Sequence, residues 1–244
     1  MSSPKVTTGQ LSLIGVVVVL LVALTWFGIN FKTATYDKPI EIPKNENASK
    51  ADIFSLLHRF AGSNEKLNTQ VENIEKDSLN PEYIDALEAS GTSSRIPVFN
   101  AYALYLKGII KSSSQLLQES ADMFFEAGTH DPDSMADRTT YSVYSIRACD
   151  RILKNDPSNK AALTTKATCL VYFEGAVMAG VGLLKEVESM DSNYVDAQHH
   201  LMLLAIQSGQ YEKAKIRLKK LLSLQPDNQQ YADMLLNLET QQLK

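Results

Sequence analysis

The sequence contains little cysteine, with two residues among 244, Cys149 and Cys169. Both fall within apolar helical patterns, and they lack the spacing of metal-binding cysteines. They are either two buried thiols or the two halves of a disulfide between neighbouring helices. The sequence leaves these alternatives open, so the cysteines do not identify a redox compartment.

Signatures of catalysis and of metal binding are also lacking. The chain has four histidines and no G-x-S-x-G, Walker or H-E-x-x-H motif. The adjacent His199 and His200 would point about 100° apart on a helix, whereas chelation from one helix needs a spacing of four residues. Gly175, Gly180 and Gly182 follow a helical pattern rather than a strand, which disfavours a phosphate loop. We therefore expect no enzyme activity, no metal and no cofactor.

An excess of positive charge is absent as well. The formal net charge is −4, and charged residues make up 21% of the chain, as in ordinary folded proteins. Nucleic acid is not an expected partner, because phosphate binding needs a basic face. Lys213, Arg217 and Lys220 share one face of a predicted helix. That face is expected to be solvated, or otherwise to meet acidic lipid or an acidic protein.

Charged residues are missing from one long stretch, Leu11 to Ile29. These 19 residues approach the roughly 20 that cross a bilayer, and Trp26 and Phe27 suit the membrane interface. We predict a transmembrane helix at 11–29, a polar tail at 1–10 and an extended tether at 30–50. A cleaved signal peptide is the alternative, but its apolar region is usually shorter, and Lys32 makes a cleavage site at Ala34 poor.

Helical patterning begins after the tether. Residues 51–80 predict two leading helices, the first with a stripe that includes Ile53, Leu56 and Leu57, and the second a surface helix with Leu67 among its apolar residues. Residues 81–244 then predict about four helix pairs and a final capping helix. Its inward residues are expected to be Ala232, Leu235, Leu236 and Leu238.

The predicted pairs begin at Pro81, and the second, third and fourth span residues 113–155, 158–190 and 193–226. In the first pair the helix is expected to end at Ser90–Gly91 and a loop to follow through Arg95, and in the second the first helix is expected to close at Ala127–Gly128. The glycines of the third pair would either loosen it or bring its backbone close to a neighbour.

An internal period supports the repeats. The motifs Pro157-Ser-Asn159, Asp191-Ser-Asn193 and Pro226-Asp-Asn228 recur at spacings of 34 and 35 residues. Neither helix of such a pair can bury its apolar stripe alone, so stacking of the pairs is expected.

The stretch 193–226 carries the best-formed pair. Its second helix places Tyr211, Ala214, Leu218, Leu221 and Leu222 on one face, and Gly209 can adopt the left-handed conformation that ends the first helix. The pair resembles a tetratricopeptide repeat, whose pattern is supplied by Met202, Gly209, Tyr211, Ala214 and Pro226.

The stretch from Glu174 to Val187 is also similar to single-span tetratricopeptide repeat proteins of Gram-negative bacteria. By this analogy we expect a bacterial inner-membrane protein with its repeats in the periplasm. The lysines that flank the apolar run slightly favour the reverse orientation, so the expected orientation rests on the analogy.

The resemblance implies an all-α, TPR-type α-solenoid whose first helices line a groove for a partner protein. The Lys, Arg and Asn residues with which some such proteins clamp a terminal carboxylate are absent. Phe125, Val171 and Ile206 could instead pack between helices. The groove candidates are Gln118, Asp122, Phe125, Thr164, Thr168, Tyr172, Asp196, His199, Leu203 and Ile206.

A repeat architecture without a chemical site suggests a membrane-anchored scaffold or adaptor that binds a partner protein through this groove. The alternative is a permanent structural subunit, docked into a larger membrane complex through the transmembrane and leading helices.

Overall fold

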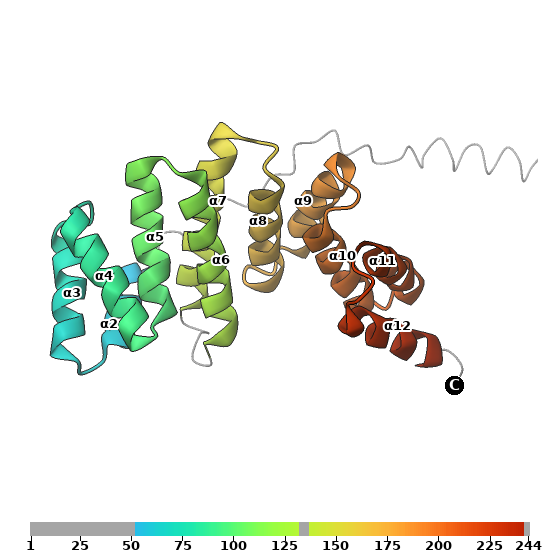
Figure 1. The fold of residues 1–244 in the computed structure, drawn as a ribbon, viewed down its shortest axis with the longest axis horizontal. Helices are drawn as coiled ribbons and strands as arrows, with labels where there is room; N and C mark the ends of the chain where they lie inside the picture. The colour runs from blue at the N-terminus through green and yellow to red at the C-terminus, as the bar shows by residue number, and fades with distance from the viewer. Residues whose placement is uncertain (1–51, 132–136, 242–244) are drawn as a thin grey trace, which may run out of the picture. The chain divides into compact units, whose positions relative to one another are not determined.

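A computed structural model describes residues 52–131 and 137–241, and within these ranges the chain forms helices and no strand (Figure 1). They belong to one compact unit, residues 42–244. The predicted all-α fold class is confirmed. The helices are α2 (Ile53–Ala61), α3 (Glu65–Lys76), α4 (Pro81–Ser94), α5 (Pro97–Lys111), α6 (Ser114–His130), α7 (Arg138–Asn155), α8 (Lys160–Tyr172), α9 (Val177–Met190), α10 (Val195–Gln207), α11 (Tyr211–Leu224) and α12 (Gln229–Gln241).

The predicted tail, membrane helix and tether lie outside the described residues. Across 52–131 and 137–241, no helix is both long enough and apolar enough to cross a bilayer.

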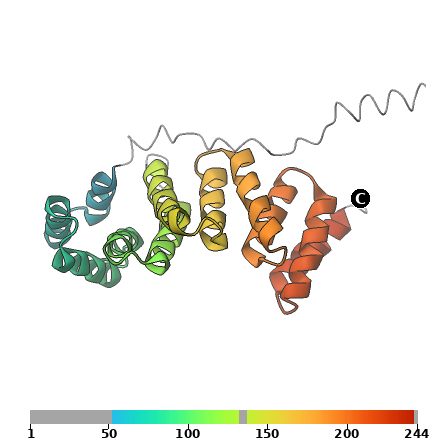
Figure 2. The ribbon, with the colours of Figure 1, turned by 90° about the horizontal axis from the view of Figure 1, so that it is seen from above.

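Each helix packs against the next one along the chain, from α2 to α12 (Figures 1 and 2). Helix α4 pairs with α5, α6 with α7, α8 with α9, and α10 with α11. Helix α8 also contacts both α6 and α10, so the first helices of three pairs lie side by side. This is the arrangement of an α-solenoid, in which each pair covers the apolar stripe of its neighbours.

The buried apolar residues form three successive clusters along the stack. The first joins α2 to α7 around Phe99, Phe124 and Tyr141, the second centres on α8 and α9, and the third joins α10, α11 and α12. Cys149 and Cys169 are both buried and both free thiols, which settles the alternative left by the sequence. Burial raises the pKa of Cys169 to about 12, so this thiol stays protonated and unreactive at neutral pH.

The turns that precede α8, α10 and α12 each contain the same kind of backbone hydrogen bond. The backbone N–H of Asn159, Tyr194 and Asn228 donates to the carbonyl of the residue three positions earlier, at 3.1, 3.1 and 3.2 Å. Asn159 and Asn228 then cap the next helix with their side chains. Residues 159, 194 and 228 are therefore structurally equivalent. The alignment of the sequence motifs placed Asn193 in this series, which is one residue too early. Tyr194 consequently occupies a cap position without acting as a side-chain cap.

Two glycines behave as the sequence suggested. Gly209 has φ +70° between α10 and α11, a conformation that other residues rarely adopt. Gly180 lies where α9 crosses α8, and a Cβ atom there would sit 2.6 Å from the carbonyl oxygen of Ala167 and 2.5 Å from Cγ2 of Val171. Of the two alternatives for the third repeat, close approach to a neighbour is therefore the one observed at Gly180.

Two predictions about helix ends were wrong. Helix α4 continues through Gly91 to Ser94, because this glycine is buried under α5, where a Cβ would meet Oδ1 of Asn100 at 2.2 Å. Helix α6 likewise continues through Gly128 to His130, since that glycine packs against Tyr141. In both cases the glycine serves a helix–helix contact and not a helix end.

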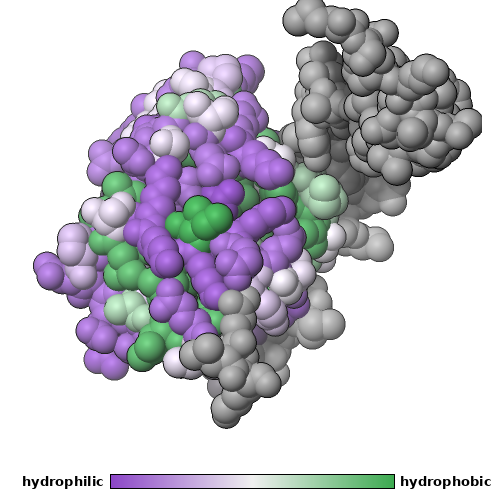
Figure 3. Space-filling model, turned by 90° about the vertical axis from the view of Figure 1, so that its right-hand side faces the viewer, coloured by the Kyte–Doolittle hydropathy of each residue, from purple (hydrophilic) through white to green (hydrophobic). Residues whose placement is uncertain are grey.

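Two apolar residues assigned to buried faces are exposed. Tyr211, at the start of α11, is 43% exposed, and Leu236 of α12 is 59% exposed. Helix α12 instead buries Tyr231 and Leu238, with Met234 and Leu235 packed beside them. Figure 3 shows the end of the molecule that carries α10–α12, where hydrophilic side chains surround small separate apolar areas. Such a polar face suits the end of a helical stack.

The expectation that Arg217 is solvated was also wrong. Its Nη1 atom lies 2.7 Å from Oε1 of Glu188 on α9 and 2.5 Å from Oε1 of Gln198 on α10. The hydrogen bond from Arg217 is the main cause of the lowered pKa of Glu188. Arg217 therefore ties three helices together.

Helix α2 is held by contacts distant in sequence. Phe54 meets the ring of Tyr102 edge-on at 6.0 Å, and Arg59 pairs with Asp131 and, at 2.8 Å, with Asp137. The buried residues Ile53, Leu56 and Leu57 belong to the same core as α5 and α7. The apolar stripe of α2 is therefore covered by the chain itself.

The contact at Gly180 gives a test of the stack. In an open helix position, Gly to Ala would stabilise the protein by up to about 1 kcal/mol. Here we expect Gly180→Ala to lower the free energy of unfolding by about 1–3 kcal/mol, because the added methyl group meets backbone. Urea denaturation followed by circular dichroism measures the change, and a stabilised variant would contradict the close approach.

Candidate functional site

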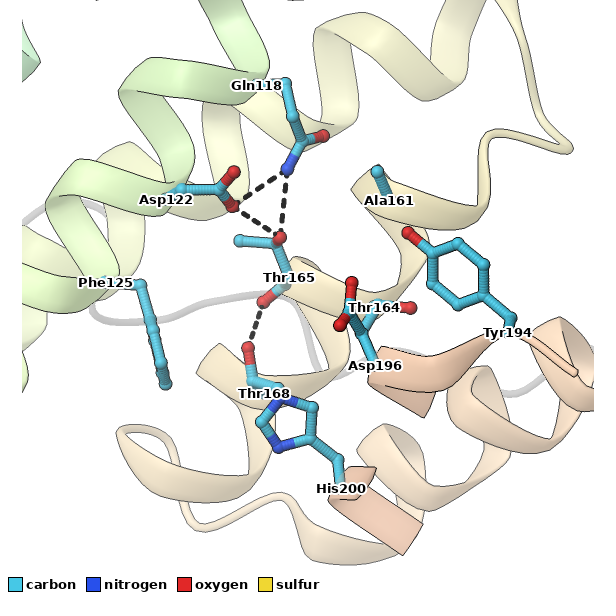
Figure 4. A pocket seen from close by; sticks show the side chains of 10 residues that line it. All are labelled: Gln118, Asp122, Phe125, Ala161, Thr164, Thr165, Thr168, Tyr194, Asp196 and His200. Carbon is cyan, nitrogen blue, oxygen red and sulfur yellow. Dashed lines mark hydrogen bonds between the residues drawn. The ribbon is translucent and has the colours of Figure 1, made fainter. Parts of the chain in front are cut away.

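A cavity of about 230 Å³ opens where the first helices of three repeats lie side by side (Figure 4). Helices α6, α8 and α10 supply all of its lining except Tyr194, which immediately precedes α10. The lining residues are Gln118, Asp122, Phe125, Ala161, Thr164, Thr165, Thr168, Tyr194, Asp196 and His200.

A compact hydrogen-bond network joins α6 to α8 in this cavity. Gln118 Nε2 donates to Oδ1 of Asp122 at 2.9 Å and to the hydroxyl of Thr165 at 3.0 Å. The Thr165 hydroxyl donates to the same Asp122 oxygen at 2.7 Å, and the Thr168 hydroxyl donates to the Thr165 carbonyl at 2.8 Å. The network uses both N–H bonds of the Gln118 amide and fixes the direction in which its oxygen points.

The two carboxylates of the cavity lie in an electronegative setting. Partial burial raises the pKa of Asp122, the hydrogen bonds from Thr165 and Gln118 oppose this rise, and the charge of Asp196 adds to it. Burial also raises the pKa of the Tyr194 hydroxyl, and Asp196 again contributes. Among the described residues, neither Asp122 nor Asp196 has a cationic side chain within ion-pair distance.

Several polar atoms of the lining have no partner within the described parts of the chain. They are Oε1 of Gln118, Oγ1 of Thr164 and Nδ1 of His200. Thr164 is only 5% exposed. Buried polar atoms normally have a hydrogen-bond partner, because leaving one without costs about 1–3 kcal/mol. Three such atoms around one cavity mark it as a place where a polar ligand can bind.

His200 is held neutral. Burial lowers its pKa to about 4, and the neighbouring His199 adds to the effect. The Tyr172 ring lies beside it, with centroids 6.1 Å apart. Within the described ranges, no three His, Cys, Asp or Glu side chains gather as a metal site would require.

The structure brings six of the ten groove candidates together at the cavity. These are Gln118, Asp122, Phe125, Thr164, Thr168 and Asp196. Tyr172 does not line it, but its ring lies between Phe125 and His200, with centroids at 6.2 and 6.1 Å.

The remaining three candidates face the last helix. The Nδ1 atom of His199 lies 3.1 Å from the Tyr231 hydroxyl of α12, and Leu203 and Ile206 pack against the core that α12 shares. For Ile206, core packing was the alternative left open by the sequence. Phe125 is partly buried against the core and also lines the cavity, so both interpretations hold for it.

The ten groove candidates do not include four lining residues, Ala161, Thr165, Tyr194 and His200. Thr165 and His200 each follow a predicted groove position by one residue, which is a rotation of about 100° on a helix. This neighbouring face meets the preceding repeat, since Thr165 bonds Gln118 and Asp122 of α6, and the His200 ring lies beside Tyr172 of α8. Tyr194 was missed because the letter motif assigned Asn193 to the helix start.

These features define a class of protein, an all-helical stack of paired helices with a polar cavity across the first helices of successive pairs. The tetratricopeptide repeat family model matches residues 174–238, from the turn before α9 into α12. This part of the chain is thus similar to tetratricopeptide repeats, which generally mediate protein–protein interaction. No curated protein matches the chain significantly.

The buried imidazole predicts acid sensitivity. The folded-state pKa of His200, about 4, lies below the unfolded value of 6.5, so the unfolded chain takes up the proton first. Stability should therefore fall as the pH drops from 6.5 toward 4, and at pH 5 His200 should account for a loss of about 2 kcal/mol. We expect His200→Gln to remove this part of the loss, measured by urea denaturation at pH 7.5 and 5.

His130→Gln is the matched control, because His130 is exposed at the end of α6. This variant should retain the acid sensitivity of the unsubstituted chain. Equal pH dependence in the unsubstituted chain and in His200→Gln would contradict the assignment.

Proposed function

We propose that this chain is a membrane-anchored adaptor that holds a partner protein in the groove of α6, α8 and α10. One observation carries the proposal: groove positions of three successive repeats converge on a cavity in which three polar atoms lack partners in the described chain. The proposal assigns no reaction to the protein. Extended and helical segments are the ligands that such grooves commonly accept.

The anchor in this proposal is the apolar run 11–29, supported by its length and lack of charge. We propose a bacterial inner membrane with the repeats in the periplasm, on the resemblance described above. The alternative, a permanent subunit docked through its leading helices, is less favoured. The apolar residues of α2 and α3, including Leu57 and Val71, are already buried within the chain's own core.

Site-specific photocrosslinking tests the groove. Ala161 lines the cavity and its side chain makes no hydrogen bond, so it can be replaced by a benzophenone amino acid in the full chain. Irradiation of cells that express this variant should yield one discrete adduct with a second protein, identified by mass spectrometry. The same replacement at Glu186, exposed on α9, is the control and should not yield that adduct.

The groove proposal would be wrong if both positions gave the same set of adducts, or if position 161 gave none while the variant remained folded. Circular dichroism of the purified variants checks the folding.

Membrane fractionation tests the anchor. The full chain should stay in the pellet after alkaline carbonate extraction and dissolve in detergent, because a helix of about 20 apolar residues inserts stably. A variant that lacks 11–29 should move entirely to the soluble fraction. Release of the full chain by carbonate would exclude a spanning helix, and digestion of the repeats by protease added to spheroplasts would support the periplasmic orientation.

A further inference from the structure

The unused hydrogen-bonding groups of the cavity are mostly acceptors. Both N–H bonds of Gln118 and the hydroxyl hydrogens of Thr165 and Thr168 are already donated within the chain. Most of what is left over at the same place is acceptor: Oε1 of Gln118, the second oxygen of Asp122 and an oxygen of Asp196, whereas the Thr164 hydroxyl and the neutral His200 ring can each also donate. A ligand that completes this site must therefore bring donors.

The charge of the cavity points the same way. It is lined by two carboxylates and by no lysine or arginine among the described residues. Lys160 lies near its rim, with Nζ 5.3 Å from the Tyr194 ring centroid, and is paired at 2.7 Å with Asp191. Asp122 is partly buried, and the charge of Asp196 acts on it unfavourably. A cationic group in the cavity would offset this repulsion.

Resting on the adaptor function proposed above, we infer that the cavity takes an arginine side chain of the partner protein. The guanidinium group offers five N–H donors in a plane, which suits several acceptors that approach from different helices. The aromatic rings of Phe125 and Tyr194 in the lining supply faces on which a guanidinium can stack. The buried Thr164 hydroxyl, unpartnered in the described chain, adds a further acceptor.

The volume of the cavity favours a single side chain over a larger ligand. Pockets for drug-sized molecules and cofactors commonly measure about 300–1,000 Å³. The cavity here is smaller, about 230 Å³, and it lies on a groove along which the rest of a partner segment can continue. It therefore suits one long side chain inserted from a bound polypeptide.

A neutral isostere tests the inference. The probe is the peptide acetyl-Ala-Ala-Arg-Ala-Ala-amide, and its control has citrulline, which keeps the shape of arginine without its charge. Saturation-transfer NMR with the detergent-purified full chain measures both. We expect the arginine peptide to bind at least tenfold more tightly and to weaken as salt is raised, because salt screens charge. Equal affinity for the two peptides would overturn the inference, and a lysine peptide that binds as tightly would overturn the guanidinium preference.

The double variant Asp122→Asn, Asp196→Asn should lose about tenfold in affinity for the arginine peptide. Asp233→Asn is the matched control, because Gln229 Nε2 donates to Oδ1 of Asp233 at 2.9 Å, the same four-residue arrangement as Gln118 and Asp122. This control should bind as the unsubstituted chain does. Unchanged binding by the double variant would place the peptide elsewhere and overturn the inference.

The two proposals can fail separately. A partner crosslinked at position 161 whose capture is unaffected by the double variant would leave the adaptor function standing and overturn the arginine site. Tight, charge-dependent peptide binding without any captured protein would leave the arginine site standing and count against the adaptor.

Discussion

Burial of each helix's apolar stripe against the neighbouring helices is the interaction on which this structure depends. Helix α8 is an example. It packs against α9, where Gly180 approaches the Ala167 carbonyl, and it also contacts α6, α7 and α10. Stability in such a stack is a sum of pair-to-pair interfaces and does not reside in any one pair. The outermost helices must then be closed by something, since an open interface would expose apolar surface.

The two ends are closed differently, and this decides where a partner can bind. Helix α2 lies against Tyr102 and is pinned by Arg59 to residues next to the α6–α7 connection. At the other end, α12 engages His199 and shares a core with Leu203 and Ile206. Positions that would face a ligand in a longer stack are thus used by the chain itself. Between these ends, α6, α8 and α10 keep three polar atoms without a partner in the described chain, Oε1 of Gln118, Oγ1 of Thr164 and Nδ1 of His200.

Periodicity made much of this predictable. The four pairs, the capping helix, the left-handed turn at Gly209 and six of the cavity residues follow from apolar spacing and from the repeat resemblance. The errors share a physical cause: the identity of a residue does not reveal which other residues it contacts in the folded chain. Gly91 serves a close helix contact although glycine often ends helices, and Arg217 finds Glu188 and Gln198 only after three helices have assembled. The position of Tyr194 at the start of α10 is defined by the hydrogen bond from its N–H to the Asp191 carbonyl, which the sequence does not show.

The cavity residues lower the stability of the fold, whereas the apolar stripe of each helix raises it. An unpartnered Thr164 hydroxyl, an unpartnered His200 Nδ1 and two neighbouring carboxylates each lower the stability of the free protein. Packing does not require any of them, because the stack is held by the apolar face of the same helices. A group that supplied donors and positive charge would remove several of these costs at once, and its binding free energy would include that relief. The repeat architecture permits this arrangement, since the face that stabilises a helix and the face that meets a ligand are separate.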